Sequence, residues 1–211
     1  MVKDDRINLQ TNTAALSVSP DPAGGFIIKT SRGDIRANQI VHANNAYVGG
    51  LLPEYRKSIV PSKGICCRIT VPKGKTAPLL NNSYINREKD KTLHYLVPRT
   101  DGSIIVGGAA QEFKAFRDQW YNNTDDSTLI EAAKDYYRGY MQRTYTGWED
   151  SGAKVDSIWS GIMGYTYDTH PHVGVVPEKP GNFILAGFNG HGVSESIQSR
   201  RATFLTYRRC L

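Results

Sequence analysis

The residues whose types and spacing could do chemistry lie near the end of the chain, where an apolar segment gives way to glycines. Residues 182–186 read N-F-I-L-A, which is typical of a buried strand, and residues 187–192 read G-F-N-G-H-G. Glycines adopt positive φ and let backbone amides approach a ligand closely. If a helix begins just after Gly192, its unpaired N–H groups and dipole favour negative charge at this bend. The guest could be a phosphate or the edge of a reduced flavin ring, or the glycines could serve packing alone.

Other residues that often bind metals or act as nucleophiles form no cluster. His170 and His172 lie two positions apart without a third ligand, so no metal site is predicted. The three cysteines are Cys66, Cys67 and Cys210, an odd number without a C-x-x-C pair, which argues against a disulfide framework or zinc. Cys66 and Cys67 lie in an apolar run, and we expect them to be buried free thiols. No Ser/His/Asp or Cys/His triad stands out.

The composition is that of an ordinary globular protein. The 211 residues are 39% hydrophobic and 22% charged, with a net charge of +6. The basic residues are scattered among acidic ones, so a nucleic-acid-binding protein is not predicted. The first residues lack an apolar signal core, and no apolar stretch reaches the length of a membrane span. We therefore expect a soluble, intracellular protein that binds neither nucleic acid nor membrane.

The elements that must position the glycine bend are mostly strands. The β-branched and apolar runs that predict strands are residues 15–18, 26–30, 35–43, 64–71, 84–85, 93–97, 104–108, 172–176 and 182–186. Asp101-Gly102 predicts a hairpin turn. One clear helix is predicted from a capping box at Thr128 and Glu131, with an apolar stripe at helical spacing, and it should end before Gly147. Residues 155–164 are mixed and glycine-rich, and we expect Trp159 to pack in a core.

Several of these segments follow a recognisable pattern. Residues 159–174 read W-S-G-I-M-G-Y-T-Y-D-T-H-P-H-V-G, and a short hairpin then leads to A-G-F-N-G-H-G at 186–192. Residues 95–108 read Y-L-V-P-R-T-D-G-S-I-I-V-G-G, and residues 40–47 read I-V-H-A-N-N-A-Y. In order and spacing they resemble the D-amino-acid-oxidase family of FAD-dependent oxidoreductases, which includes glycine and sarcosine oxidases. The resemblance covers about residues 7–193.

The resemblance implies an α+β fold with an incomplete FAD-binding domain and a mostly antiparallel substrate domain. Residues 1–62 would be a partial FAD-domain segment and 63–158 the substrate domain. Residues 159–193 would return to the FAD domain, and 194–211 would form a divergent basic tail. The family's chemistry is hydride transfer from the C–H next to an amine nitrogen to flavin. The substrate would be a small amine or amino acid.

The resemblance also implies site residues. Those expected at the cofactor are Ala15 on the adenine-side strand; Ala43, Asn44 and Asn45 beside the cofactor; Gly164 and Thr166 facing the isoalloxazine; and Gly187, Asn189, Gly190, His191 and Gly192 at the N1–C2 edge. Tyr165 and Arg99 are the predicted catalytic residues. Tyr165 and Tyr95 could line a substrate pocket or a core, and Arg99 could bind a substrate carboxylate or form a surface ion pair. Met163 stands where some relatives attach FAD through Cys, so non-covalent FAD is predicted.

Two departures from the family bear on function. The family opens with G-x-G-x-x-G, which binds the FAD pyrophosphate, and this motif occurs nowhere in the sequence. The chain is therefore expected to be a fragment that needs an N-terminal segment, or else an inactive remnant that serves as a binding or regulatory module. Some relatives hold the substrate carboxylate with a Lys just after G-H-G, where this sequence has Ser194. That difference argues against a sarcosine-like substrate.

Overall fold

The chain divides into two structural units, each with its own sheet structure and apolar core. The computed structural model describes residues 7–192. Of the described residues, 7–59 and 166–192 form the first unit, and 60–165 form the second. Within the described range, strands dominate and the helices are short, which confirms the predicted α+β class with antiparallel sheets. The predicted tail, 194–211, lies outside the described residues.

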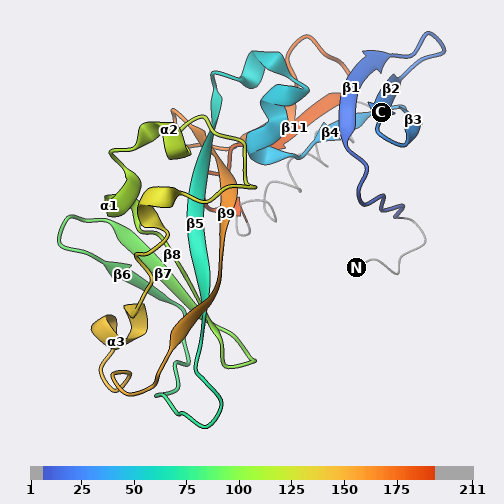
Figure 1. Cartoon of the computed structure of the whole chain (residues 1–211). Coiled ribbons are helices and arrows are strands. Elements are labelled where there is room, and N and C mark those ends of the chain that lie inside the picture. Colours follow the sequence, from blue (N-terminus) through green and yellow to red (C-terminus); the bar gives the residue numbers. More distant parts are fainter. Residues whose placement is uncertain (1–6, 193–211) are drawn as a thin grey trace. The chain divides into compact units, whose positions relative to one another are not determined.

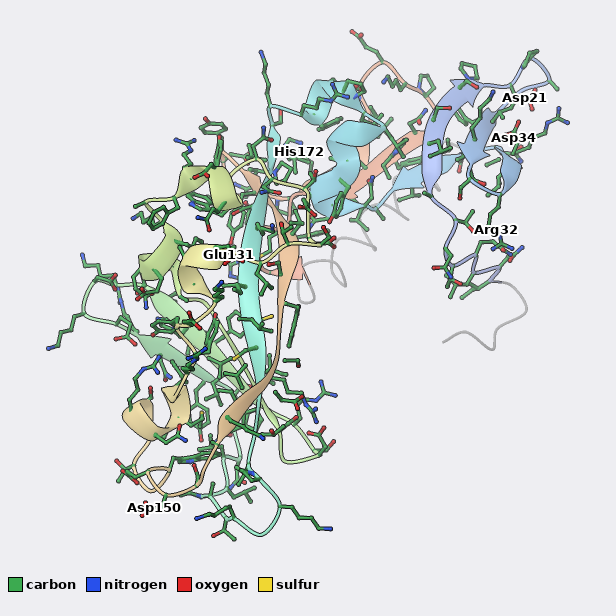
Figure 2. The ribbon with its side chains drawn as sticks, viewed as in Figure 1. Asp21, Arg32, Asp34, Glu131, Asp150 and His172 are labelled. Carbon is green, nitrogen blue, oxygen red and sulfur yellow. The ribbon has the colours of Figure 1, made fainter. Side chains whose placement is uncertain are left out.

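The first unit opens with a three-stranded antiparallel meander. Its strands are β1 (Ala15–Pro20), β2 (Phe26–Thr30) and β3 (Gly33–Ala37), in the order β1-β2-β3. The turn between β1 and β2 is fixed by Asp21, whose side chain accepts a hydrogen bond from the Ala23 amide at 3.0 Å. The same carboxylate lies 3.1 Å from the Arg36 guanidinium on β3. Asp21 is labelled at this end of the meander in Figure 2. Strands β1 and β2 confirm the strands predicted from the apolar runs at residues 15–18 and 26–30.

A second sheet of the first unit brings two distant chain segments together. The hairpin of β10 (His172–Val175) and β11 (Asn182–Ala186) is antiparallel, and β11 pairs in parallel with β4 (Ile40–His42). Because β4 and β11 run in the same direction, the residues that follow them leave the sheet at the same edge. The buried core of this unit also includes two 3₁₀ turns, η1 (Asn45–Gly50) and η2 (Pro53–Tyr55). That core consists of Val48, Leu52, Tyr55, Ile59, Val176, Ile184 and Ala186.

The second unit is built on a five-stranded sheet with the order β6-β7-β8-β5-β9. The strands are β5 (Ile59–Thr70), β6 (Tyr84–Arg87), β7 (Leu93–Pro98), β8 (Ile104–Gly107) and β9 (Lys154–Thr166). Figure 1 shows β5 and β9 as two long strands side by side. The predicted hairpin between β7 and β8 is confirmed, because the Arg99 amide donates to the Ser103 carbonyl at 2.8 Å.

Strand β9 covers residues 155–164, a stretch for which the sequence predicts no element. The glycines at 161 and 164 lower the strand propensity of this stretch, yet it forms a strand of 13 residues. Pairing with the long strand β5 supplies the hydrogen bonds that local propensity does not predict. The prediction that Trp159 packs in a core is also wrong, since 40% of its surface is exposed.

The single long helix predicted near residues 129–146 is wrong. In its place lie the 3₁₀ turn η3 (Glu131–Ala133) and the short helix α3 (Tyr140–Thr144). Gly139 adopts φ 61°, which interrupts any continuous helix. The predicted capping box is absent too: the Thr128 hydroxyl donates to Asp125 at 2.8 Å and accepts from the Lys63 ammonium at 2.7 Å.

The apolar stripe of the predicted helix nevertheless faces the core, as expected. Ala133, Tyr140 and Met141 are buried, and Leu129 and Tyr136 pack against them. The other helices of this unit are α1 (Ala110–Phe113) and α2 (Arg117–Trp120). The buried cluster consists of Ile65, Cys67, Ile69, Leu96, Ile104, Val106, Ala109, Phe113, Ile130, Ala133, Tyr137, Tyr140, Met141, Trp148 and Ala153.

A histidine side chain lies in this core. His94 is 0% exposed and stacks on Tyr136, with ring centroids 5.2 Å apart. The Ala109 amide donates to its Nδ1 at 3.4 Å. Burial lowers the pKa of His94 below its ordinary value, so the ring is held in its neutral form. The polar and charged groups that act on the ring are Glu88, Asp90, Gln111 and Arg143.

Candidate functional site

The glycine bend after β11 is a tight turn with two left-handed residues. Asn189 has φ 53° and Gly190 has φ 87°, and the His191 amide donates to the Phe188 carbonyl at 2.8 Å. Two consecutive positive-φ residues with Asn-Gly in the centre are typical of a type I′ turn. Gly187, just before the turn, has φ 78°, and a Cβ there would lie 2.6 Å from Thr166 Cγ2. The glycine at 187 therefore permits a close internal contact, as packing requires.

The amides of this bend fall into two groups. The Asn45 side-chain carbonyl accepts from the Gly187 amide at 2.8 Å and from the Phe188 amide at 3.3 Å. By contrast, the amides of Asn189 and Gly190 donate to no acceptor within residues 7–192. Gly190 is exposed and Asn189 is half-buried. The turn thus presents two N–H donors at its tip, and these could hold an anionic or electron-rich group.

The Asn189 side chain fixes the turn to the end of β9. Its Oδ1 accepts from the Thr166 amide at 2.8 Å, and its Nδ2 donates to the Gly187 carbonyl at 2.8 Å. Thr166 is 8% exposed and its hydroxyl donates to the His170 carbonyl at 3.0 Å. Asn189 and Thr166 therefore hold the turn in shape, and they leave the backbone amides at the tip unobstructed.

The residues after β4 lie at the same edge of the sheet as the bend. Asn45, which supports the bend, adopts φ 46°. Asn44 is half-buried, and its side-chain Oδ1 is fully buried without a hydrogen-bond partner in the described part of the chain. An unsatisfied buried acceptor costs about 1–3 kcal/mol. Because Ala43 is exposed, this corner offers one acceptor in need of a donor beside a small, accessible side chain.

The remaining predicted cofactor residues of the first unit are more peripheral. The His191 ring is exposed, and its Nδ1 lies 3.1 Å from the Asn189 carbonyl, so it caps the turn. Gly192 is half-buried, and a Cβ there would lie 3.8 Å from Phe188 Cβ. Ala15 is exposed at a register shift in the β1–β2 pairing, in the separate meander sheet.

A cavity of about 350 Å³ in the first unit lies away from the bend. It borders the start of β11, where Asn182 Oδ1 lies 3.1 Å from His42 Nε2. Gly187 follows Asn182 by five residues, which is about 16 Å along a strand. The cavity is lined by Val18, Ser19, Pro20, Phe26, His42, Leu51, Leu52, Glu178, Lys179, Pro180 and Asn182. None of the predicted site residues lines it.

The two predicted catalytic residues belong to the second unit and lie far apart. Arg68 on β5 binds Asp156 at 2.9 Å and Asp101 at 3.0 Å, which places the turn that holds Arg99 beside Asp156. Tyr165 lies nine residues beyond Asp156 on β9, or about 30 Å along a strand. The Arg99 and Tyr165 side chains are therefore too far apart to lie in one small-molecule site. Arg99 is exposed and makes no ion pair within the described residues.

Tyr165 lies among residues that the sequence interpretation did not assign to a site. Its side chain is 39% exposed, and its hydroxyl contacts Met163 Sδ at 3.8 Å. Burial of the surrounding surface raises the pKa of Tyr165 above its ordinary value, so the phenol stays protonated at neutral pH. Gly164, the preceding residue, is buried. The signal that could have revealed this face is the alternation of Trp159, Gly161, Met163 and Tyr165, which matches the period of a strand.

Comparisons with known proteins find relatives in sequence and in fold. The family model described as "FAD dependent oxidoreductase" matches residues 3–198. A probable oxidoreductase, OrdL, of Rhizobium meliloti is 25% identical over 88% of this chain and 39% of its own length. The glycine oxidase of Bacillus subtilis is 26% identical over 86% of this chain and 44% of its own length.

Solved structures share the fold. The crystal structure of glycine oxidase from Geobacillus kaustophilus has a TM-score of 0.64 at 24% identity, over 89% of this chain and 45% of that one. The crystal structure of L-proline dehydrogenase from P. horikoshii has a TM-score of 0.62 at 20% identity, over 85% and 45%.

These findings define the class: the FAD-dependent oxidoreductases of the D-amino-acid-oxidase and glycine-oxidase type. The chain belongs to the FAD-dependent oxidoreductase family, because that family's model matches most of its length. It spans less than half the length of the curated relatives named above. Among residues 7–192 there is no helix long and apolar enough to cross a membrane, and no group of three or more metal-binding side chains.

Proposed function

We propose that this chain provides part of the flavin site and the substrate-binding sheet of an enzyme that oxidises an amine or amino acid. The observation that carries the proposal is the exposed turn at Asn189 and Gly190, whose two amides donate to no acceptor in the described residues. Membership of the FAD-dependent family supports FAD as the group that these amides serve.

The residues of the first unit fit a flavin in charge and in hydrogen bonding. The Asn189 and Gly190 amides would donate to the N1–C2 edge of the ring, where negative charge gathers on reduction. The buried Asn44 Oδ1 needs a donor, and the N–H and O–H groups of a flavin and its ribityl chain supply such donors. Asn45 and Thr166 would keep the turn rigid, so that no reorganisation is needed as charge develops.

The bound FAD would accept a hydride from the C–H next to the amine nitrogen, which leaves an imine that water can hydrolyse. The protein's own part is to orient that C–H and to exclude water. We assign substrate contact to Tyr165 and withdraw it from Arg99, because about 30 Å of strand separates the two. The neutral Tyr165 hydroxyl can donate to a substrate or accept from it.

FAD attachment is proposed to be non-covalent. Cys67 is buried, and burial raises the pKa of its thiol to about 12, which removes its reactivity at neutral pH. Because the sequence contains no G-x-G-x-x-G, we propose that the pyrophosphate is held by a glycine-rich segment outside this sequence. Acid precipitation of the loaded protein should leave all the yellow colour in the supernatant.

The test is FAD binding by the purified chain, measured as quenching of the flavin fluorescence. We expect a saturable complex, and we expect Gly190→Val to weaken it at least tenfold, because valine resists φ 87° and would move the two amides. Gly102→Val is the matched control, since Gly102 has φ 78° in the β7–β8 turn and an open position for a side chain.

The outcomes separate cleanly. Loss of binding in Gly190→Val with retention in Gly102→Val supports the assignment of the turn. Equal binding by both variants contradicts that assignment, and a chain that binds no FAD even when a glycine-rich phosphate-binding segment is added to it refutes the proposed function. With FAD bound, bleaching of the visible flavin bands by an amine or amino acid is the expected sign of hydride transfer.

A further inference from the structure

One face of the five-stranded sheet in the second unit carries apolar and aromatic side chains that remain exposed. Along β9, Trp159, Gly161, Met163 and Tyr165 alternate onto this face, while Ser160 on the opposite face is buried. Trp159 is 40% exposed and Tyr165 is 39% exposed. The β9 part of this surface, from residue 159 to 165, is here called the aromatic face.

Glycines form the floor of the aromatic face. A Cβ added at Gly64 on β5 would lie 2.9 Å from Met163 Cε, so the methionine side chain lies over that glycine. A Cβ added at Gly161 would meet no heavy atom within 4 Å. The position between Trp159 and Met163 is therefore open, with backbone as its floor, and it has room for an apolar group.

The neighbouring strands extend the same surface. Tyr95 on β7 lies over Gly107 on β8, where an added Cβ would lie 2.1 Å from its ring. Its hydroxyl interacts electrostatically with the thiol of Cys66, which pairs with Gly107 from the other side. Val97 on β7 is 40% exposed on this face. Tyr95 and Val97 thus extend the apolar and aromatic surface across β7.

Positive charge near this surface is already neutralised or distant. Arg68 is held by two carboxylates, Asp101 and Asp156, at 3.0 and 2.9 Å. Arg87 lies on β6, four strands from β9, or about 19 Å away. Arg99 lies in the turn beside Asp156, and Gly161 follows Asp156 by five residues, or about 16 Å. None of these three guanidinium groups is placed to bind a carboxylate at Gly161.

We infer, on the basis of the proposed function, that the aromatic face selects an amine with an apolar substituent over an amino acid with a carboxylate. The apolar group would occupy the open position at Gly161, between Trp159 and Met163. The amine head would lie against the face of Trp159, which attracts positive charge through its ring quadrupole. A carboxylate there would lose its hydration and gain no cation, which costs free energy.

The test uses two probes that share an N-methylamine and differ in the second group: N-methylbenzylamine and sarcosine. Trp159 is the exposed tryptophan at the site, and quenching of its fluorescence in the full chain reports binding. We expect saturable quenching by N-methylbenzylamine and at least tenfold weaker binding of sarcosine. Trp159→Phe should remove the signal, which assigns it to this residue.

A variant that fills the open position gives the decisive result. Gly161→Leu places a side chain where no atom lies within 4 Å, so the fold should persist while N-methylbenzylamine binding falls at least tenfold. Gly50→Leu is the matched control, because Gly50 is also open but lies in η1 of the first unit. Unchanged binding in Gly161→Leu, or tighter binding of sarcosine than of N-methylbenzylamine, overturns the inference.

Flavin binding is measured on the same samples, so that the two proposals can fail separately. A chain that binds FAD yet fails to select N-methylbenzylamine refutes the inference and leaves the proposed function standing. A chain that selects N-methylbenzylamine and binds no FAD, even with a glycine-rich phosphate-binding segment added to it, refutes the proposed function, and the aromatic face is then an amine-binding surface without redox chemistry.

Discussion

Asn45 gives the sharpest test of how the glycine bend is held. Its side-chain carbonyl is the acceptor for the Gly187 and Phe188 amides, and both of those residues are buried. Asn45→Gly removes this acceptor and still accommodates φ 46°, since glycine adopts positive φ without strain. The variant therefore isolates the two hydrogen bonds from the backbone conformation.

The expected magnitude follows from those two bonds. Each buried donor left unsatisfied costs about 1–3 kcal/mol, and the longer bond to Phe188 belongs at the low end. We expect local stability to fall by about 2–4 kcal/mol, which corresponds to faster exchange of the nearby amides by roughly 30- to 1000-fold. Asn45→Asp retains an acceptor and tolerates the left-handed region, so it should recover most of this loss.

The assay is hydrogen–deuterium exchange followed by mass spectrometry, read on peptides that cover β11 and the bend. A peptide from β7 in the second unit serves as the internal reference, because its exchange should not change. If Asn45→Gly accelerates exchange less than threefold, or if Asn45→Asp is as damaging as Asn45→Gly, the two hydrogen bonds do not hold the bend and the reasoning is refuted.

Three further predictions concern the second unit. His94 has a folded pKa below its unfolded value, so the stability it contributes is fully present above about pH 6.5 and falls as the pH drops toward the folded pKa. The unaltered chain should therefore have a lower urea midpoint at pH 5 than at pH 8, and in His94→Gln the two midpoints should lie closer together. The Cys67 thiol, with its pKa raised to about 12, should resist alkylation at pH 8 until urea unfolds the chain, as labelling read by mass spectrometry will show. Lys63→Met should change the free energy of unfolding by less than about 1.5 kcal/mol. Thr128→Val leaves the buried Lys63 ammonium without its hydroxyl partner, so it should lower the free energy of unfolding by about 3 kcal/mol or more, as urea unfolding will measure.

The strands could be predicted because their signals are local. Residues 26–30 and 182–186 each combine apolar or β-branched side chains with turn residues at their ends, and the structure places strands at both. The Asp-Gly turn at 101–102 likewise encodes its own geometry. In each of these cases the local preference and the tertiary pairing agree.

The failures occur where tertiary contacts override the local pattern. The stripe from Leu129 to Met141 has helical spacing, but Gly139 turns left-handed and the stripe reaches the core in short pieces. The Thr128 hydroxyl serves Lys63 and Asp125, which lie outside any capping motif. Strand β9 was missed for the converse reason, because its partner β5 lies about 90 positions earlier in the sequence.

The candidate site shows the same division between what is local and what is not. The sequence G-F-N-G-H-G predicts a bend with positive φ, and Asn189 and Gly190 adopt it. It does not reveal that Asn45 consumes the amides of Gly187 and Phe188, because that contact spans more than 140 positions. The donors available to a cofactor are consequently those of Asn189 and Gly190 at the tip. Gly187 serves mainly to let Thr166 pack closely, so a substitution there should act on the shape of the turn, and one at Gly190 should act on the ligand.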